Sequence, residues 1–275
     1  MALLDELCVF DVETIPDVSV LASLTGSGTS ELQQMRKELE DYHIGVSRDG
    51  NPFPRQPFHR IVAISLLRAT IHGKNGSEHY ELERVGTLSS RNKTEEQIVR
   101  SFFDYFCGHS PRIVGYNSRT FDLPVLKYRA MKYAIPAAKL FMANNRWENY
   151  SSRYSLKWHC DLLETLSDFG LSARCKMNEV CSILGIPGKM DGMDGSKVTD
   201  LFDCGNIEEL DSYCETDVLS TYLIYLNYAL LTGLIAKDGF MAMNEDLLNY
   251  LRSRKKENFN RFIAEWEKID SRGIF

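Results

Sequence analysis

Three acidic segments of the chain have residue types and spacings that could bind divalent metal ions. In the first, Asp11 and Glu13 lie two residues apart in an otherwise apolar stretch that begins at Leu7. Positions i and i+2 of a β-strand point to the same face, so the two carboxylates project together. On its own, such a pair is more often two solvated acids at the end of a strand.

The second segment joins a predicted strand to a predicted helix. The strand ends at Asn117, and Asp122 stands at the start of the helix, two residues before Pro124. An aspartate just before an early helical proline is typical of an N-cap, whose carboxylate accepts a backbone N–H of the first turn. Capping and metal binding compete for the same oxygens, so Asp122 is a candidate for either role.

The third segment lies in a long predicted helix, residues 207–231. At about 100° per residue, Asp217 falls inside the apolar stripe of this helix. The other members of that stripe are Leu210, Cys214, Thr221, Ile224 and Tyr228. We expect Glu208 and Glu215, on the opposite face, to be solvated. A carboxylate in a core is costly unless it is paired or bound to a metal, so Asp217 is either half of a buried ion pair with an arginine or a metal ligand.

Convergence of these segments would place four carboxylates, those of Asp11, Glu13, Asp122 and Asp217, within a few ångströms of one another. Each like-charged pair at about 4 Å costs on the order of 4 kcal/mol at an effective dielectric near 20, so we expect bound cations or retained protons. All-oxygen ligands favour Mg²⁺ or Mn²⁺ over zinc. Two such ions can bind the attacking and leaving oxygens of a phosphodiester. The phenol of Tyr213, one helical turn before Asp217, could orient the attacking water.

The elements that must position these residues alternate along the chain. Apolar and β-branched runs predict strands at 6–13, 60–70, 80–85, 112–117 and 158–163. Helices are predicted at 29–42, 94–106, 122–132 and 207–231, the second with Thr94 as its cap. A meander followed by βαβ units predicts an α/β fold, a mixed sheet of about five strands with helices on both faces.

Two further segments affect the organisation of the chain. We expect residues 1–235 to form one domain and residues 236–275 to pack on it as a C-terminal helical extension. The segment 45–59 is a polar loop with three prolines, and a loop of this length inside a compact domain is often a functional lid.

The ordered set of motifs resembles the DEDD family of 3′–5′ exonucleases in its tyrosine form. The matching stretches are Phe10 to Thr14, Asn117 to Asp122 and Tyr213 to Asp217. More narrowly, residues 6–232 are similar to the stand-alone predicted exonucleases related to the proofreading domain of family B DNA polymerases. The supporting stretches are Pro57 to Ser65, Leu184 to Lys189, Asp194 to Val198 and Tyr213 to Leu219.

The resemblance implies a ribonuclease H-like fold and two-metal hydrolysis from the 3′ end, which releases nucleoside 5′-monophosphates. It also implies roles for individual residues. Asp11, Glu13, Asp122 and Asp217 would be the metal ligands, with Tyr213 orienting the water. Thr14, Asn117 and Phe121 fall where such enzymes contact the terminal nucleotide.

A basic window supplies candidate contacts to the substrate. Residues 112–158 contain nine lysines and arginines against two acidic residues, with seven tyrosines and tryptophans interleaved. Basic side chains can hold phosphates while aromatic faces stack unpaired bases, so we predict single-strand binding here through Arg146 and Arg153. The alternative is a solvated helix face beside core aromatics. Lys189, before a glycine-rich loop, either touches a phosphate or is an exposed turn lysine.

Composition limits the class of protein. The 275 residues carry a formal net charge of −6, so nucleic-acid binding must depend on a local patch or on metal ions. The seven cysteines are odd in number and contain no CxxC pair, which argues against a zinc site or a disulfide framework and favours reduced thiols in the cytoplasm. We expect no signal peptide and no membrane span.

Three functions are consistent with these features. The leading expectation is a metal-dependent 3′–5′ exonuclease that acts on single-stranded DNA ends. A ribonuclease that trims RNA 3′ ends stays open, because the distinction depends on contacts to the 2′-OH. The third is a catalytically silent nucleic-acid-binding protein on the same fold. The sequence indicates no protein partner and no oligomeric state.

Overall fold

The computed structural model describes residues 4–74, 76–142, 145, 147–188 and 197–270, so the candidate residues Arg146 and Lys189 lie outside it. Within the described residues, one sheet has five strands in the order β3-β2-β1-β4-β5. The strands are β1 (Glu6–Pro16), β2 (His59–His72), β3 (His79–Ser89), β4 (Arg112–Gly115) and β5 (His159–Asp161).

The pairing of the strands identifies the fold. β2 is antiparallel to both β1 and β3, whereas β1, β4 and β5 are parallel to one another. This mixed order, with β2 alone running against the others, is the arrangement of the ribonuclease H-like fold. The predicted fold class is therefore confirmed.

Helices follow and separate the strands. They are α1 (Leu21–Thr25), α2 (Leu32–Val46), α3 (Glu95–His109), α4 (Asp122–Lys132), α5 (Ala138–Phe141), α6 (Leu162–Leu166), α7 (Met177–Leu184), α8 (Lys197–Asp203), α9 (Ile207–Leu231), α10 (Lys237–Arg254) and α11 (Glu257–Asp270). Short 3₁₀ turns lie at Val18–Val20 (η1), Gln56–Phe58 (η2) and Asp168–Gly170 (η3).

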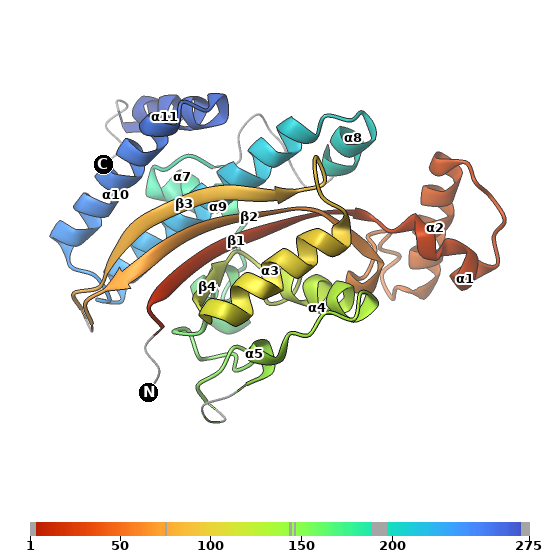
Figure 1. Cartoon of the computed structure of the whole chain (residues 1–275), viewed down its shortest axis with the longest axis horizontal. Helices are drawn as coiled ribbons and strands as arrows, with labels where there is room; N and C mark the ends of the chain where they lie inside the picture. The colour runs from red at the N-terminus through yellow and green to blue at the C-terminus, as the bar shows by residue number, and fades with distance from the viewer. Residues whose placement is uncertain (1–3, 75, 143–144, 146, 189–196, 271–275) are drawn as a thin grey trace.

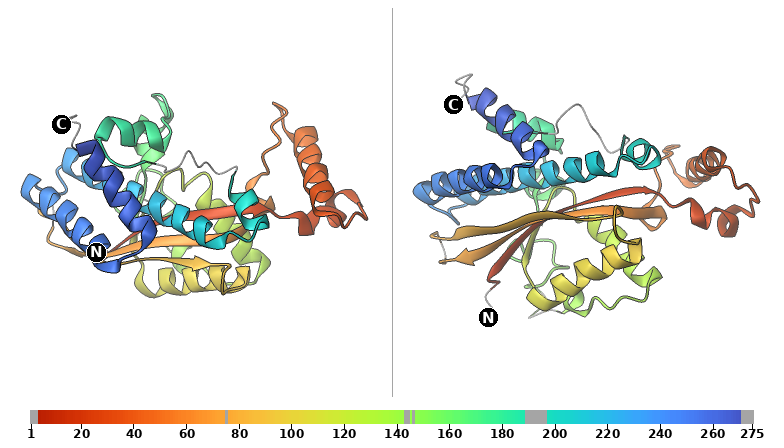
Figure 2. Two further views of the ribbon diagram at one scale, coloured as in Figure 1. Left: turned by 90° about the horizontal axis from the view of Figure 1, so that it is seen from above. Right: turned by 45° about the horizontal axis from the view of Figure 1, so that its top comes forward.

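The helices cover both faces of the sheet. α7, α9, α10 and α11 lie on one side and α3, α4 and α5 on the other (Figures 1 and 2). The side chains of β1 alternate between the two cores that result: Leu7 and Val9 pack with α9, α10 and α11, whereas Cys8 and Phe10 pack with α3 and α4. This period of two is what an apolar strand buried on both faces requires.

The predicted element boundaries agree closely where a capping or periodic signal was strong. Thr94 caps α3 in a capping box with Gln97, and α4 and α9 have the predicted bounds. β5 is shorter than predicted, because Asp161 accepts the N–H of Glu164 and starts α6. The predicted loop 45–59 begins after α2, which runs on to Val46, and it contains η2.

The helices after residue 235 are joined to the same core. Leu247 of α10 and Phe262 of α11 belong to the cluster that contains Leu7 and Val9. The predicted domain boundary at residue 235 stays a prediction. In the described part of the chain, no helix combines the length and the apolar character that a membrane crossing needs.

The expectation that Glu215 is solvated is wrong. Its side chain is buried, and its carboxylate accepts hydrogen bonds from Lys256 Nζ at 2.8 Å and Asn258 Nδ2 at 2.9 Å. These donors come from the α10–α11 junction and the start of α11, which cover the face of α9 that the helical wheel assigned to solvent. Glu215 therefore anchors the C-terminal helices to α9.

A buried ion network holds α4, the helix that begins with Asp122. Arg129 of α4 donates to Asp17 at 2.6 Å and to Glu95 at the start of α3. Burial alone would raise the pKa of Asp17, but hydrogen bonds from Ser19, Lys132 and Arg129 outweigh it and lower that pKa to about 2. The network thus joins the end of β1, α3 and α4.

Removal of this guanidinium is expected to be strongly destabilising. Arg129→Met would leave Asp17 and Glu95 buried without their shared cation, which costs about 3–5 kcal/mol of unfolding free energy. The matched control is Lys132→Met, which removes a partner of the same Asp17 but from a side chain that is 40% exposed. We expect that control to lose less than about 1 kcal/mol. Urea unfolding measures both, and equal losses would contradict the buried network.

Candidate metal centre

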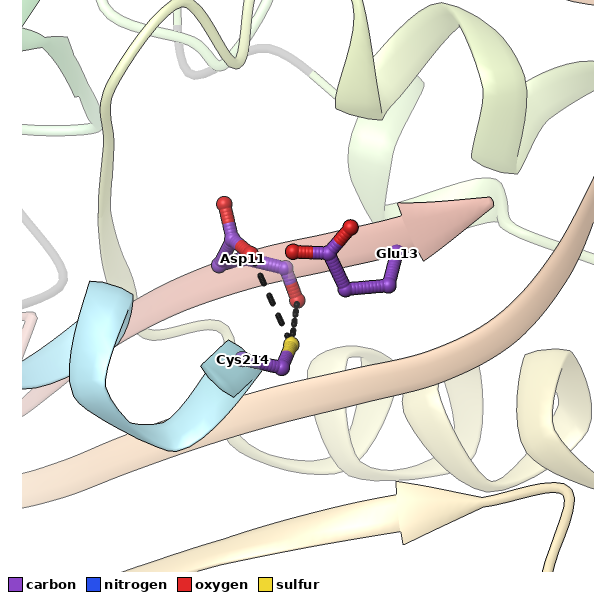
Figure 3. A group of neighbouring side chains, drawn as sticks. All are labelled: Asp11, Glu13 and Cys214. Atoms are coloured by element: carbon purple, nitrogen blue, oxygen red, sulfur yellow. Dashed lines mark hydrogen bonds between the residues drawn. The ribbon is translucent and has the colours of Figure 1, made fainter. Parts of the chain in front are cut away.

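Two carboxylates extend from the face of β1 that packs on α9. Asp11 and Glu13 continue the alternation that Leu7 and Val9 begin. Figure 3 shows both side chains on β1, with Cys214 reaching toward them from α9. One potential ligand atom from each of the three lies within 4.8 Å of the others. The middle of β1 and one turn of α9 thus form the centre of the site.

Asp122 adds a third carboxylate from α4. Its Oδ1 accepts the backbone N–H of Val12 at 3.0 Å, and Val12 lies between Asp11 and Glu13. The side chain does not cap α4, since the N-cap position is Phe121 and has no side-chain cap. Of the two roles left open by the sequence, capping is therefore excluded, and the carboxyl group is turned toward β1.

Asp217 and Tyr213 approach the same point from α9. Both are at most 5% exposed. Burial raises the pKa of the Tyr213 phenol, and the negative charges of Asp217, Glu13 and Asp11 raise it further, as does a hydrogen bond with Asp217. Acidic groups from both β1 and α9 therefore raise the pKa of this one phenol.

The electrostatics of these acids suit bound cations. Burial raises the pKa of Asp122 well above its usual value, and the neighbouring charge of Asp11 raises it further. A buried carboxylate that resists ionisation is stabilised when a cation shares it. The donor set is mainly carboxylate oxygen, which fits Mg²⁺ or Mn²⁺ better than zinc.

Cys214 is the member of this group that the sequence did not mark as functional. Its Sγ lies 3.5 Å from Oδ2 and 3.6 Å from the backbone oxygen of Asp11. Burial raises the pKa of the thiol well above its usual value, and Asp11 and Glu13 add to the effect. The thiol therefore stays protonated and donates to Asp11. A signal was present, since Cys214 lies three residues before Asp217 on the same helical stripe.

The loop before α4 is held by a second acid. Asn117 has a left-handed backbone, with φ of 69°, and its N–H donates to Asp161 at 3.1 Å. The N–H of Arg119 donates to the other oxygen of the same carboxylate at 2.8 Å. Asp161 thus fixes the loop that leads into Phe121 and Asp122.

Thr14 and Phe121 meet at a buried histidine. His59 must donate from Nε2 to the carbonyl of Pro54 at 2.8 Å, because a carbonyl only accepts. Its Nδ1 then accepts the hydroxyl of Thr14 at 2.9 Å. The ring also lies edge-on to Phe121, with centroids 4.9 Å apart. His59 and His159 are both packed, hydrogen-bonded residues.

These histidines give stability a specific pH dependence. Burial lowers the pKa of His59 to about 4 and that of His159 well below its usual value. An unfolded histidine has a pKa of about 6.5, so below that pH the unfolded chain binds more protons. Stability due to the neutral rings is present above pH 6.5 and falls as the pH falls toward 4. His59 alone accounts for about 2 kcal/mol between pH 7 and pH 5.

Urea unfolding at pH 7 and pH 5 checks this expectation. The loss of unfolding free energy should be about 2 kcal/mol smaller in His59→Gln than in the unsubstituted protein. The exposed His72, replaced in the same way, should leave the loss unchanged. Equal losses in all three proteins would contradict a neutral His59.

The basic window carries less surface charge than its composition suggests. Arg112 and Arg129 are buried and paired with Glu78, Asp17 and Glu95, all outside the window. Arg153 donates to Glu164 at 2.8 Å and is 42% exposed. Exposed aromatic residues remain along the window, namely Tyr128, Trp147 and Tyr154. Arg153 stays a predicted substrate contact, now with an acidic neighbour.

Comparison of sequences gives one family. Residues 51–266 match the family described as predicted 3′–5′ exonuclease related to the exonuclease domain of PolB. The matched range includes Asp122, Tyr213 and Asp217, whereas Asp11 and Glu13 precede it. No curated protein matches the chain.

Three solved structures that are similar to the chain belong to larger proteins. The family B DNA polymerase of the hyperthermophilic archaeon Pyrobaculum calidifontis has a TM-score of 0.48 and 18% identity, covering 82% of this chain and 24% of the polymerase. A product-bound exonuclease I has a TM-score of 0.36 and 14% identity, covering 83% and 44%. E. coli exonuclease I in complex with a dA16 oligonucleotide has a TM-score of 0.33 and 15% identity, covering 94% and 45%. The chain spans about a quarter of the polymerase and less than half of exonuclease I.

Proposed function

The chain belongs to the family of predicted 3′–5′ exonucleases related to the exonuclease domain of PolB, and on that premise we propose that it removes nucleoside 5′-monophosphates from the 3′ end of single-stranded DNA. One observation carries this proposal. The charges of Asp11 and Glu13 on β1 and of Asp217 on α9 all act on the protonated phenol of Tyr213, and Asp122 of α4 accepts the N–H of Val12, between the two acids of β1. A structural role alone gives no reason to bury so many like charges together.

Asp11, Glu13, Asp122 and Asp217 are the proposed ligands of two Mg²⁺ or Mn²⁺ ions. When bound, such ions lower the pKa of a water molecule and neutralise the charge that develops on the leaving 3′ oxygen. The raised pKa of Asp122 supports this assignment, because it reports a carboxylate whose charge lacks compensation. The Cys214 thiol, which donates to Asp11, would fix the orientation of that ligand.

Tyr213 would position the attacking water rather than deprotonate it. Its raised pKa keeps the phenol protonated, so the hydroxyl can donate to or accept from a water but is a poor base. The proposed contacts to the terminal nucleotide are Thr14 of β1 and, in the loop before α4, Asn117 and Phe121. Arg146, Arg153 and Lys189 are proposed to hold more distant phosphates.

A 3′-end degradation assay tests the function. Single-stranded DNA labelled at its 5′ end should shorten one nucleotide at a time when protein and Mn²⁺ are added. The same DNA labelled at its 3′ end should release labelled 5′-mononucleotide from the first time point. Intact label after incubation with folded protein, or random internal cuts, would contradict the proposal.

The same assay separates the alternatives. An RNA strand of the same sequence tests the exoribonuclease, which would degrade RNA faster than DNA. If the chain is a silent binding protein, it should bind both strands and shorten neither.

All seven cysteines are free thiols, which supports the proposed cytoplasmic location, since that compartment keeps thiols reduced.

A further inference from the structure

The segment before β2 presents an aromatic ring that the site described above does not use. Phe53 is 58% exposed, although its ring is packed on one side. Its centroid lies 5.0 Å from that of His59 and 6.0 Å from that of Phe121. The ring of Phe53 therefore packs on His59 and Phe121 with one part and remains accessible to a ligand with the rest.

Hydrogen bonds fix the segment that carries this ring. The backbone oxygen of Pro54 accepts a hydrogen bond from His59 Nε2 at 2.8 Å. Gln56 Nε2 donates to the backbone oxygen of Thr120 at 3.1 Å. The backbone N–H of Phe53 donates to the side chain of Asn51 at 2.9 Å. The Gln56 contact ties the segment to the loop before α4 and the other two hold its local shape, so the exposed ring loses little conformational entropy when it binds.

The position of the ring relates it to the reacting end of a substrate. Phe121, which it touches, directly precedes the carboxylate of Asp122. His59, its other neighbour, is hydrogen-bonded to Thr14, directly after Glu13. An exposed aromatic face is the surface on which an unpaired base stacks.

We propose that Phe53 is a nucleobase-stacking residue, which receives the face of one unpaired base near the 3′ end of the strand. The inference rests on the proposed function and adds a substrate-selecting element to it. A base inside a duplex is already covered on both faces by its neighbours, so this contact favours a strand that is unpaired at its end.

Equilibrium binding of a fluorescent single-stranded oligonucleotide in EDTA, where no turnover occurs, measures the contact. Phe53→Ala should weaken binding about fivefold to 150-fold, the range for one base–aromatic stack. Phe53→Tyr keeps a π-face and should bind within about threefold of the unsubstituted protein. Phe53→Leu keeps apolar packing against Phe121 without a π-face and should resemble Phe53→Ala.

The control is another exposed apolar side chain far from the site. Leu231 is 79% exposed at the end of α9, about 21 Å along the helix axis from Asp217. Leu231→Ala should leave affinity unchanged. Full affinity in Phe53→Ala, or full affinity in Phe53→Leu alongside loss in Phe53→Ala, would overturn base stacking, because the second result assigns the effect to loop packing.

Oligonucleotides that lack one base locate the partner of Phe53. An abasic site is placed in turn at each of the three nucleotides nearest the 3′ end. At one position the unsubstituted protein should lose the affinity that Phe53→Ala loses, and the variant should lose no more there. Additive losses at all three positions would overturn the inference.

A kinetic arm keeps this result separate from the proposed function. With Mn²⁺, Phe53→Ala should raise KM by the same factor and change kcat little, since the stack is made equally in the ground and transition states. An unsubstituted protein that binds but does not shorten DNA would refute the proposed function, and the EDTA data would still decide the stacking. A KM for shortening that is unaffected by Phe53→Ala would refute the stacking alone.

Discussion

Asp217→Asn is expected to lower the rate of 3′-terminal cleavage by roughly a hundredfold to a thousandfold, the scale seen when a group that stabilises transition-state charge is removed. The substitution keeps the size of the side chain and removes one negative charge from the centre that Asp11, Glu13 and Tyr213 share. If Asp217 holds a metal ion as proposed, its loss would affect both the orientation of the water and the charge on the leaving oxygen.

The matched control lies on the same helix. Glu215 is also a buried acid of α9, but its carboxylate is bound by Lys256 and Asn258. Glu215→Gln makes the same chemical change and should leave the cleavage rate within about threefold. Single-turnover release of mononucleotide measures both variants. A cleavage rate for Asp217→Asn close to that of the unsubstituted protein, or an equal fall in Glu215→Gln, would contradict the assignment.

Asp122→Asn is expected to abolish cleavage while it stabilises the metal-free protein. Asparagine keeps the acceptor for the Val12 N–H and removes a buried charge that Asp11 opposes. We expect unfolding in EDTA to require about 0.5–2 kcal/mol more free energy than in the unsubstituted protein, as when a strained functional site is relieved.

Metal should reverse that order of stability. Mn²⁺ at a hundred times its Kd adds about 2.7 kcal/mol to a protein that binds it only when folded, which corresponds to a rise in Tm of about 5–10 °C for a chain of this size. Asp122→Asn should gain much less. Thermal unfolding with and without Mn²⁺ measures both effects, with Glu215→Gln as the control that gains as much as the unsubstituted protein. An equal gain in Asp122→Asn would exclude it as a ligand.

The sequence indicated a candidate site residue where that residue contradicts its own local pattern. Asp217 stands in an apolar stripe, and its charge acts on Tyr213 together with the charges of Asp11 and Glu13. The spacing of Asp11 and Glu13 on a strand was equally informative, because alternation is local geometry. The local sequence could not decide whether Asp122 caps its helix, because the deciding contact is with Val12, 110 residues away.

The errors arose where a partner lies far along the chain. The helical wheel of α9 assigned Glu215 to solvent, because a wheel describes one helix and cannot include the Lys256 and Asn258 that cover that face. The charge of the basic window was overstated for the same reason. Arg112 and Arg129 are neutralised by acids from other segments of the chain, and no count within the window contains them.

Anomalous X-ray diffraction from crystals soaked in Mn²⁺ tests the central claim most directly. Strong anomalous peaks should lie within bonding distance of carboxylate oxygens from β1, α4 and α9, that is, of Asp11, Glu13, Asp122 and Asp217. Crystals of Asp122→Asn should lose at least one of these peaks. Mn²⁺ bound elsewhere, with the four carboxylates left unoccupied at saturating concentration, would contradict a metal-dependent nuclease centre.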